Sequence, residues 1–146
     1  MAKWALIGAV LLAVSLSVSA RKEETLEELK AHAETASVDD RPGICIRIAE
    51  HQLDIADKLF LEGKAEEGHA ALAEVVSYSE KARDAATQSG KKLKNTEIAV
   101  RKMARKLRDV KHMVPYEDQA PVQEAIDHLE RVRTDLLARM FGRGGK

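Results

Sequence analysis

Apolar residues recur every three or four positions along most of this chain, and that period limits its fold more than any other feature. Between residues 93 and 114 the steps alternate between three and four, which is the heptad seam of a coiled coil. A second seam runs through Val122, Ala125, Leu129, Val132 and Leu136. Residues 44–62 and 64–88 have the same helical spacing, and beyond residue 20 no stretch alternates as a strand does. The sequence therefore predicts an all-α protein.

Glycine and proline mark the predicted turns. Gly63 and Gly90 each follow a helical stretch, and residues 115–121 lie between two prolines. Turns this short join antiparallel helices, so we expect two helical hairpins at about residues 44–88 and 91–141. Each helix has one apolar stripe to bury, and the simplest solution is a four-helix bundle-like domain over residues 41–141. Residues 142–146 are a short basic tail rich in glycine, predicted to be flexible.

An acidic segment precedes this domain. Residues 21–40 contain several glutamates and only a thin apolar stripe of Leu26, Leu29 and Ala33. This pattern predicts a short acidic helix, docked or loose, followed by a linker. Asp39 and Asp40 stand just before the next helix and are candidates to cap it.

The first twenty residues have the layout of a secretory signal. Lys3 is followed by an apolar run from Trp4 to Val18, and small residues precede a cleavage site after Ala20. A membrane-spanning helix needs roughly 20 apolar residues, so an uncleaved anchor is the weaker alternative. We therefore expect residues 1–20 to be a signal peptide and the protein to be periplasmic or extracellular.

One stretch resembles known proteins. Its residues run from Ala49-Glu50 through Leu53, Ala56 and Leu59 to Gly63-Lys64-Ala65-Glu66-Glu67. It is similar to helical hairpins of uncharacterised exported or membrane-anchored bacterial proteins. The resemblance implies an all-helical extracytoplasmic protein, and it implies no activity and no site residues.

Cys45 is the single cysteine, so no disulfide can form within the chain. A small buried cysteine is the ordinary interpretation. The alternative is an exposed thiol near the start of a helix, where the helix dipole would favour reaction and an intermolecular disulfide could link two copies as a homodimer.

The helix predicted from residue 91 onward is strongly basic, although lysine plus arginine and aspartate plus glutamate balance over the whole chain, at 24 each. Nine cations lie between residues 91 and 111, against only Glu97 and Asp109. With the seam buried, the outer face carries Arg101, Lys102, Arg105 and Arg108. Such a face could attract anionic lipid head groups, an acidic protein or an anionic wall polymer. In the competing interpretation, neighbouring acidic segments neutralise it.

Two short motifs suggest metal binding. Glu66 and His69 have the Glu-x-x-His spacing of di-iron helical bundles, and Asp109 and His112 repeat that spacing on another helix. A di-iron site needs two true motifs and two further glutamates, so a metal-binding bundle is only an alternative. It requires these four side chains to converge.

No motif in the sequence indicates catalysis. There is no nucleophile with a base and an oxyanion device, no haem-attachment cysteine pair and no phosphate-binding glycine loop. Aromatic residues are too few for a stacking platform, which argues against sugar or nucleic-acid binding.

We therefore expect a non-catalytic, exported interaction or scaffold protein that uses no cofactor. Its partner would be a protein or an anionic component of the cell envelope, with peripheral contact to a membrane. An extracytoplasmic chaperone or stress sensor is the main alternative, and an exposed apolar concavity able to hold unfolded clients would favour it.

Overall fold

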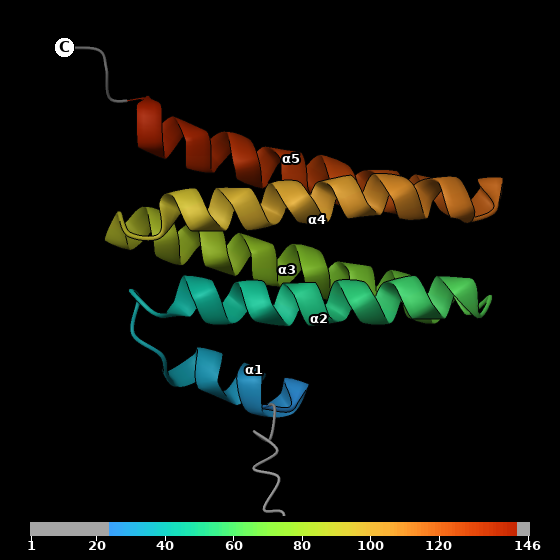
Figure 1. The fold of residues 1–146 in the computed structure, drawn as a ribbon, viewed down its shortest axis with the longest axis horizontal. Coiled ribbons are helices and arrows are strands. Elements are labelled where there is room, and N and C mark those ends of the chain that lie inside the picture. The colour runs from blue at the N-terminus through green and yellow to red at the C-terminus, as the bar shows by residue number, and fades with distance from the viewer. Residues whose placement is uncertain (1–23, 143–146) are drawn as a thin grey trace, which may run out of the picture.

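The computed structural model describes residues 24–142, which form five α-helices and one 3₁₀ turn and contain no strand (Figure 1). The all-α class is confirmed. The predicted signal peptide, residues 1–20, lies outside the described residues, as does most of the predicted tail. The elements are α1 (Leu26–Thr35), α2 (Arg41–Leu61), α3 (Ala65–Ser89), α4 (Leu93–Met113), η1 (Tyr116–Asp118) and α5 (Gln119–Phe141).

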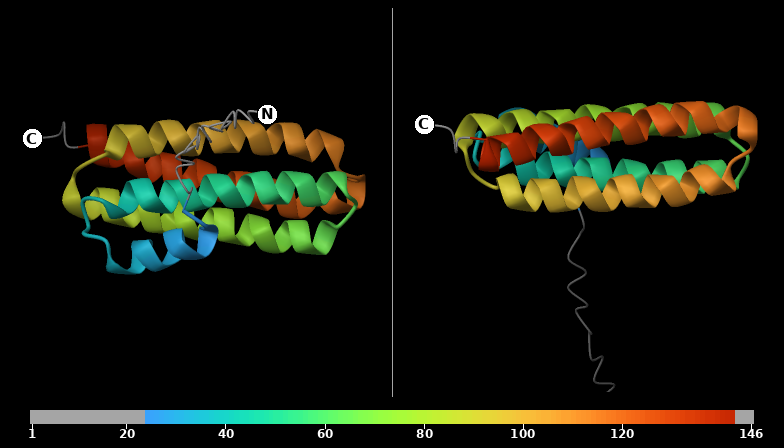
Figure 2. Two further views of the ribbon diagram at one scale, coloured as in Figure 1. Left: turned by 60° about the horizontal axis from the view of Figure 1, so that its bottom comes forward. Right: turned by 90° about the horizontal axis from the view of Figure 1, so that it is seen from above.

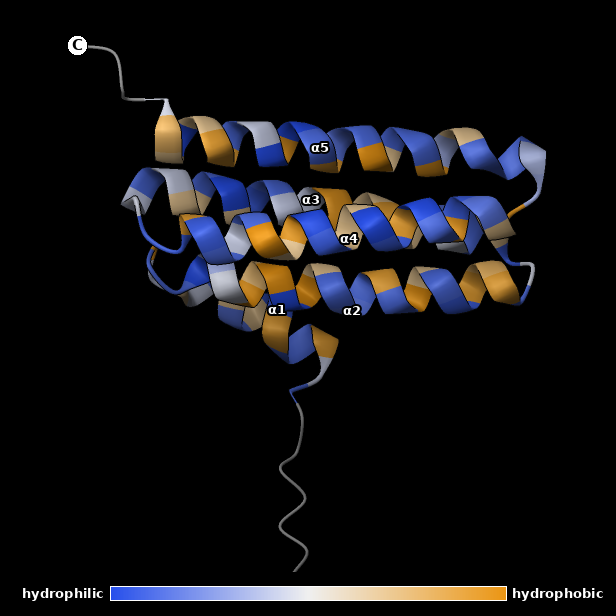
Figure 3. Cartoon of the chain, turned by 45° about the horizontal axis from the view of Figure 1, so that its top comes forward, coloured by the Kyte–Doolittle hydropathy of each residue, from blue (hydrophilic) through white to orange (hydrophobic). Residues whose placement is uncertain are grey.

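The four long helices lie side by side as rods (Figures 1 and 2). Helix α2 packs along α3, and α4 packs along α5. The two pairs meet chiefly where α3 adjoins α5, and more loosely where α2 adjoins α4. Apolar and polar stripes alternate along the helices (Figure 3), and the apolar stripes form one hydrophobic core. No helix of the described part of the chain is both long and apolar enough to cross a bilayer.

Both predicted heptad seams are buried. On α5 all five seam residues are in the core, and on α4 the seam from Thr96 to Val114 is buried as well. Leu107, Leu129 and Leu136 have no exposed surface. On α2, Ile46 and Leu53 are buried, whereas Ile55 is 39% exposed.

Helix α1 is docked through Leu29, which is fully buried, and Ala33. Thr25 and Glu28 form a capping box, in which each side chain accepts a hydrogen bond from the other residue's backbone N–H. The Arg41 guanidinium then ties the end of α1 to α2 by donating to the carbonyls of Ala33 and Ala36, at 3.3 and 2.8 Å. A ten-residue helix is marginal in isolation, so this docking stabilises α1.

Two predicted helix starts were wrong. Helix α2 begins at Arg41, three residues early, because Pro42 is compatible with a first helical turn. Helix α5 likewise begins at Gln119, inside the predicted turn, with Pro121 in its first turn. Asp40 occupies the position before α2 but does not cap it, and its carboxylate instead accepts a hydrogen bond from Ser37 Oγ at 2.9 Å.

The predicted helix ends at the two glycines are confirmed. Gly63 and Gly90 have φ of 75° and 72°, the left-handed conformation that glycine adopts without a steric penalty.

Candidate functional site

The outer face of α4 carries the four cations singled out in the sequence. Arg101, Lys102, Arg105 and Arg108, here called the basic face, are all exposed. They share one side of the helix because its opposite side, which includes Val100, Met103 and Leu107, is buried in the core.

Arg108 is neutralised by the neighbouring helix. Its guanidinium donates to Glu130 Oε1 on α5 at 2.7 Å. Glu130 also accepts a hydrogen bond from Arg133 at 2.9 Å, so this carboxylate binds two arginines. Arg108 therefore contributes to α4–α5 packing and offers little free charge.

Other cations of α4 and the turn before it are neutralised by α2 and the linker preceding α2. Lys106 is paired with Asp54, Lys91 lies 2.7 Å from Asp39, and Lys92 lies 3.8 Å from Asp40. The hydrogen bond from Lys91 to Asp39 raises the pKa of the lysine. Neighbouring acids thus neutralise Lys91, Lys92 and Lys106, as the competing interpretation expects.

Arg101, Lys102 and Arg105 form the part of the basic face that is not neutralised in this way, here called the basic patch. Within residues 24–142, no carboxylate lies within 4.0 Å of Lys102 or Arg105. The nearest acid to Arg101 is Glu97, at 3.8 Å. Glu97 is itself engaged more closely by Arg133, at 3.0 Å. The patch therefore keeps an outward positive potential.

The structure does not bring the proposed metal ligands together. Within residues 24–142, no three His, Cys, Asp or Glu side chains are grouped as metal ligands. Glu66, Asp109 and His112 are exposed, whereas His69 faces Asp118 and the ring of Phe60. The convergence that the metal-binding alternative requires is not seen, because His69 turns toward the start of α5 while Asp109 and His112 are exposed on α4.

The exposed, reactive thiol was also a wrong alternative. Cys45 is 1% exposed, and burial raises the pKa of its thiol, although the charges of Lys81 and Arg41 partly oppose that effect. A thiol kept neutral and buried is a poor nucleophile. The interpretation of Cys45 as a packing residue is the one that its burial supports.

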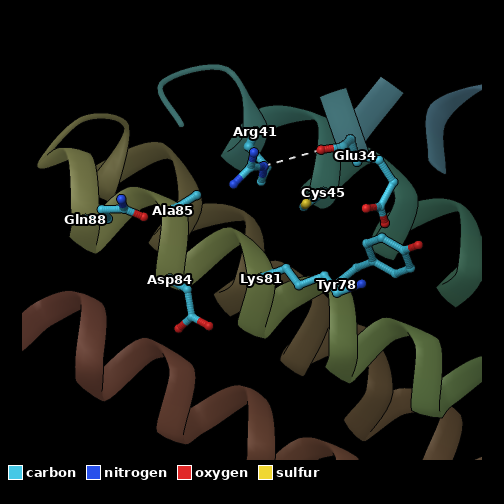
Figure 4. Close-up of a pocket in the computed structure, with 9 residues that line it drawn as sticks. Glu34, Arg41, Cys45, Tyr78, Lys81, Asp84, Ala85 and Gln88 are labelled. Atoms are coloured by element: carbon cyan, nitrogen blue, oxygen red, sulfur yellow. Dashed lines mark hydrogen bonds between the residues drawn. The ribbon is translucent and has the colours of Figure 1, made fainter. Parts of the chain in front are cut away.

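Cys45 lies at a cavity of about 390 Å³ between α1, α2 and α3 (Figure 4). Its rim carries charges of both signs, Glu34 and Asp84 with Arg41 and Lys81. The Lys81 ammonium stacks over the ring of Tyr78, 4.5 Å from its centroid, and Arg41 is occupied by the α1 carbonyls. Of these groups Arg41 holds α1 in place, whereas the contact between Lys81 and Tyr78 lies within α3.

A second hollow, about 300 Å³, lies between α3 and α5 and has an apolar floor that includes Leu72 and Val76. His69 lies 3.8 Å from Asp118, and His128 lies 3.6 Å from Glu80. Each imidazole thus faces a carboxylate from across this interface. Among the described residues, no nucleophilic side chain lines this hollow, so the two imidazole–carboxylate pairs are contacts between helices.

Comparisons with protein-family models, curated proteins and solved structures find no match to this chain. The site must therefore be interpreted from its own residues.

Sequence reasoning located the basic face but missed the acids that divide it. Glu130 and Asp54 lie on other helices, so their pairing with Arg108 and Lys106 depends on bundle geometry. One local signal was present, since Glu130 and Arg133 stand three residues apart on one helix face.

Proposed function

We propose that this chain is a non-catalytic interaction protein of the cell envelope that binds an anionic surface or partner through α4. The observation that carries the proposal is the basic patch: Arg101, Lys102 and Arg105 are exposed within about one helical turn, and no acid among residues 24–142 lies closer to them than 3.8 Å. The location in the envelope rests on the sequence of residues 1–20, which has the layout of an export signal.

The energetics favour an external partner for this patch. Like charges one turn apart repel by a few tenths of a kcal/mol, as Arg101 and Arg105 do. A cation near an anionic membrane surface gains about 1 kcal/mol, so the patch would contribute about 3 kcal/mol, or about a hundredfold in affinity. Such binding weakens as salt rises, because exposed charges are screened within about 10 Å at 0.1 M salt.

The experiment is co-sedimentation with cell-wall material and with anionic vesicles, at low and moderate salt. The test variant combines Arg101→Gln, Lys102→Gln and Arg105→Gln. The matched control combines Arg47→Gln, Lys81→Gln and Arg131→Gln, which removes the same charge from exposed positions on other helices.

Salt-sensitive binding that is lost in the α4 variant and kept in the control supports the proposal. An equal loss of binding in both variants would show that binding depends only on net charge, and it would contradict a specific binding face on α4. Absence of binding by the unaltered protein to both materials would contradict the proposal outright.

A further inference from the structure

Three large apolar side chains protrude at one end of the bundle. Leu61, at the end of α2, is 68% exposed; Met113, at the end of α4, is 58% exposed; and Tyr116, in the turn to α5, is 87% exposed. The α2–α3 and α4–α5 turns lie at this same end (Figure 1). We call these three residues the apolar tip.

Leu61 and Met113 are close neighbours although they come from different helices. Both line one hollow of about 130 Å³ between the ends of α2 and α4, together with Phe60, Val110 and Val114. Leu61 and Met113 are also largely exposed, so the apolar surface continues from this hollow onto the tip.

The apolar tip continues the basic patch along α4. Lys102 and Met113 are eleven residues apart, close to three helical turns, so they lie on the same side of the helix. Arg105 precedes Met113 by eight residues, which is about 12 Å along the axis. One surface thus presents exposed cations and then Met113, with the exposed Asp109 between them.

Seven acidic groups lie near this surface, and three of them are occupied by cations or by an imidazole. Asp54 is paired with Lys106, and Glu62 lies 3.2 Å from Lys64. Asp118 faces His69. The remaining ones are Glu50 at the α2 edge, Asp57 half-buried in the hollow, Asp109 on α4 and Glu117 beside Tyr116. Glu50 lines one hollow with Lys102, but none of these seven carboxylates lies within 4.0 Å of the side-chain nitrogens of the basic patch.

We infer that the anionic partner is a lipid bilayer, with the basic patch on the head groups and the apolar tip inserted into the interfacial region. This inference rests on the proposed function and specifies its partner. Protruding apolar side chains next to cations suit a fluid anionic bilayer, which adapts to their shape. A stable complex with a protein partner would need a matched surface of about 800 Å² on each side, which is more than the three exposed side chains of the tip present.

The test places a fluorophore at the tip of the full chain. Tyr116→Trp is combined with Trp4→Phe, because Trp4 is the single tryptophan of the sequence. Vesicles of equal parts phosphatidylglycerol and phosphatidylcholine should shift the emission of the introduced indole to the blue, and brominated acyl chains should quench it. Pure phosphatidylcholine vesicles should do neither.

A second pair of variants tests the tip by affinity. Leu61→Ser with Met113→Ser should weaken binding to the anionic vesicles about tenfold, because two exposed apolar side chains no longer enter the bilayer. The control is Phe141→Ser, which removes a 76% exposed apolar residue from the other end of the bundle and should not change binding. All variants share residues 1–20 apart from the Trp4 change in the fluorescent protein, so differences in affinity report on the tip.

The outcomes separate the two proposals. Binding to anionic vesicles with unchanged emission and quenching of the introduced indole would overturn the inference and leave the proposed function standing. Salt-sensitive binding to wall material but not to vesicles would do the same. No binding to either would overturn both.

Discussion

Arg133 Nε donates to Glu97 Oε1 at 3.0 Å across the α4–α5 interface, and Glu97 is 6% exposed. Glu130 accepts from both Arg133 and Arg108, so an alternating row of charges joins α4 to α5. This row explains why α4 can be so basic and still pack. It also divides the cations of α4, since Arg108 is held by α5 while Lys102 and Arg105 are not.

Removal of Arg133 should destabilise the fold. Arg133→Met leaves the buried Glu97 carboxylate with only the more distant Arg101, and we expect a loss of about 2 kcal/mol in the free energy of unfolding. Urea denaturation measures it. Arg131→Met is the control, because Arg131 is exposed on the same helix, and equal losses in the two variants would contradict a structural role for the Glu97–Arg133 pair.

Leu29→Ala should release α1 selectively. The ten-residue helix depends on its docking, and Ala33 and Glu34 of α1 line the cavity where Cys45 lies. We expect faster labelling of Cys45 by a thiol reagent, while the long helices retain their protection in hydrogen exchange. Leu129→Ala, at an equally buried position on α5, should cost about 2–5 kcal/mol in global stability without singling out α1. Unchanged labelling in Leu29→Ala would show that α1 does not cover the thiol.

Cys45 should make stability fall at alkaline pH. Burial raises the pKa of its thiol in the folded state above the unfolded value, so the folded protein favours the neutral form. The contribution to stability is complete below the unfolded pKa and is lost as pH rises through the folded pKa. The free energy of unfolding of the parent should therefore decrease above about pH 8.5 more steeply than that of Cys45→Ala. Parallel pH profiles would contradict a buried neutral thiol.

Alanine at two glycines should have opposite effects. Gly63→Ala puts a side chain at φ 75° and should cost about 1 kcal/mol. Gly43→Ala lies inside the first turn of α2, where an added Cβ meets only Lys92 Nζ at 4.0 Å, and should stabilise by about 0.5–1 kcal/mol. Thermal or urea unfolding of the two variants measures the sign of each change in stability. A gain in stability from Gly63→Ala would contradict the left-handed conformation at this helix end.

The helical class and most of the core could be predicted from sequence because apolar spacing directly encodes which side of a helix is buried. Val100 and Leu129 show this, since each fell on a predicted seam and is fully buried. The capping box of Thr25 and Glu28 also has a recognisable spacing, because the two residues stand three positions apart at the start of a helix. Helix starts were harder, because Pro42 and Pro121 fit a turn and a first helical turn equally well.

The candidate site was only partly predictable. The outward position of Arg101 and Lys102 followed from periodicity, but neutralisation depends on residues distant in sequence. Glu130 is 22 residues from Arg108, and only the bundle brings them to 2.7 Å. Whether His69 and His112 would meet could not be predicted either, since equal spacing on two helices does not fix how those helices face each other.

The most direct test of α4 as an anion-binding face is the dissociation constant for anionic vesicles at several salt concentrations. We predict that Arg101→Gln, Lys102→Gln and Arg105→Gln together weaken binding about a hundredfold at low salt and flatten its salt dependence. The control with Arg47, Lys81 and Arg131 changed to Gln should stay close to the parent. If the two triple variants lose affinity equally, or if neither does, α4 is not the binding face.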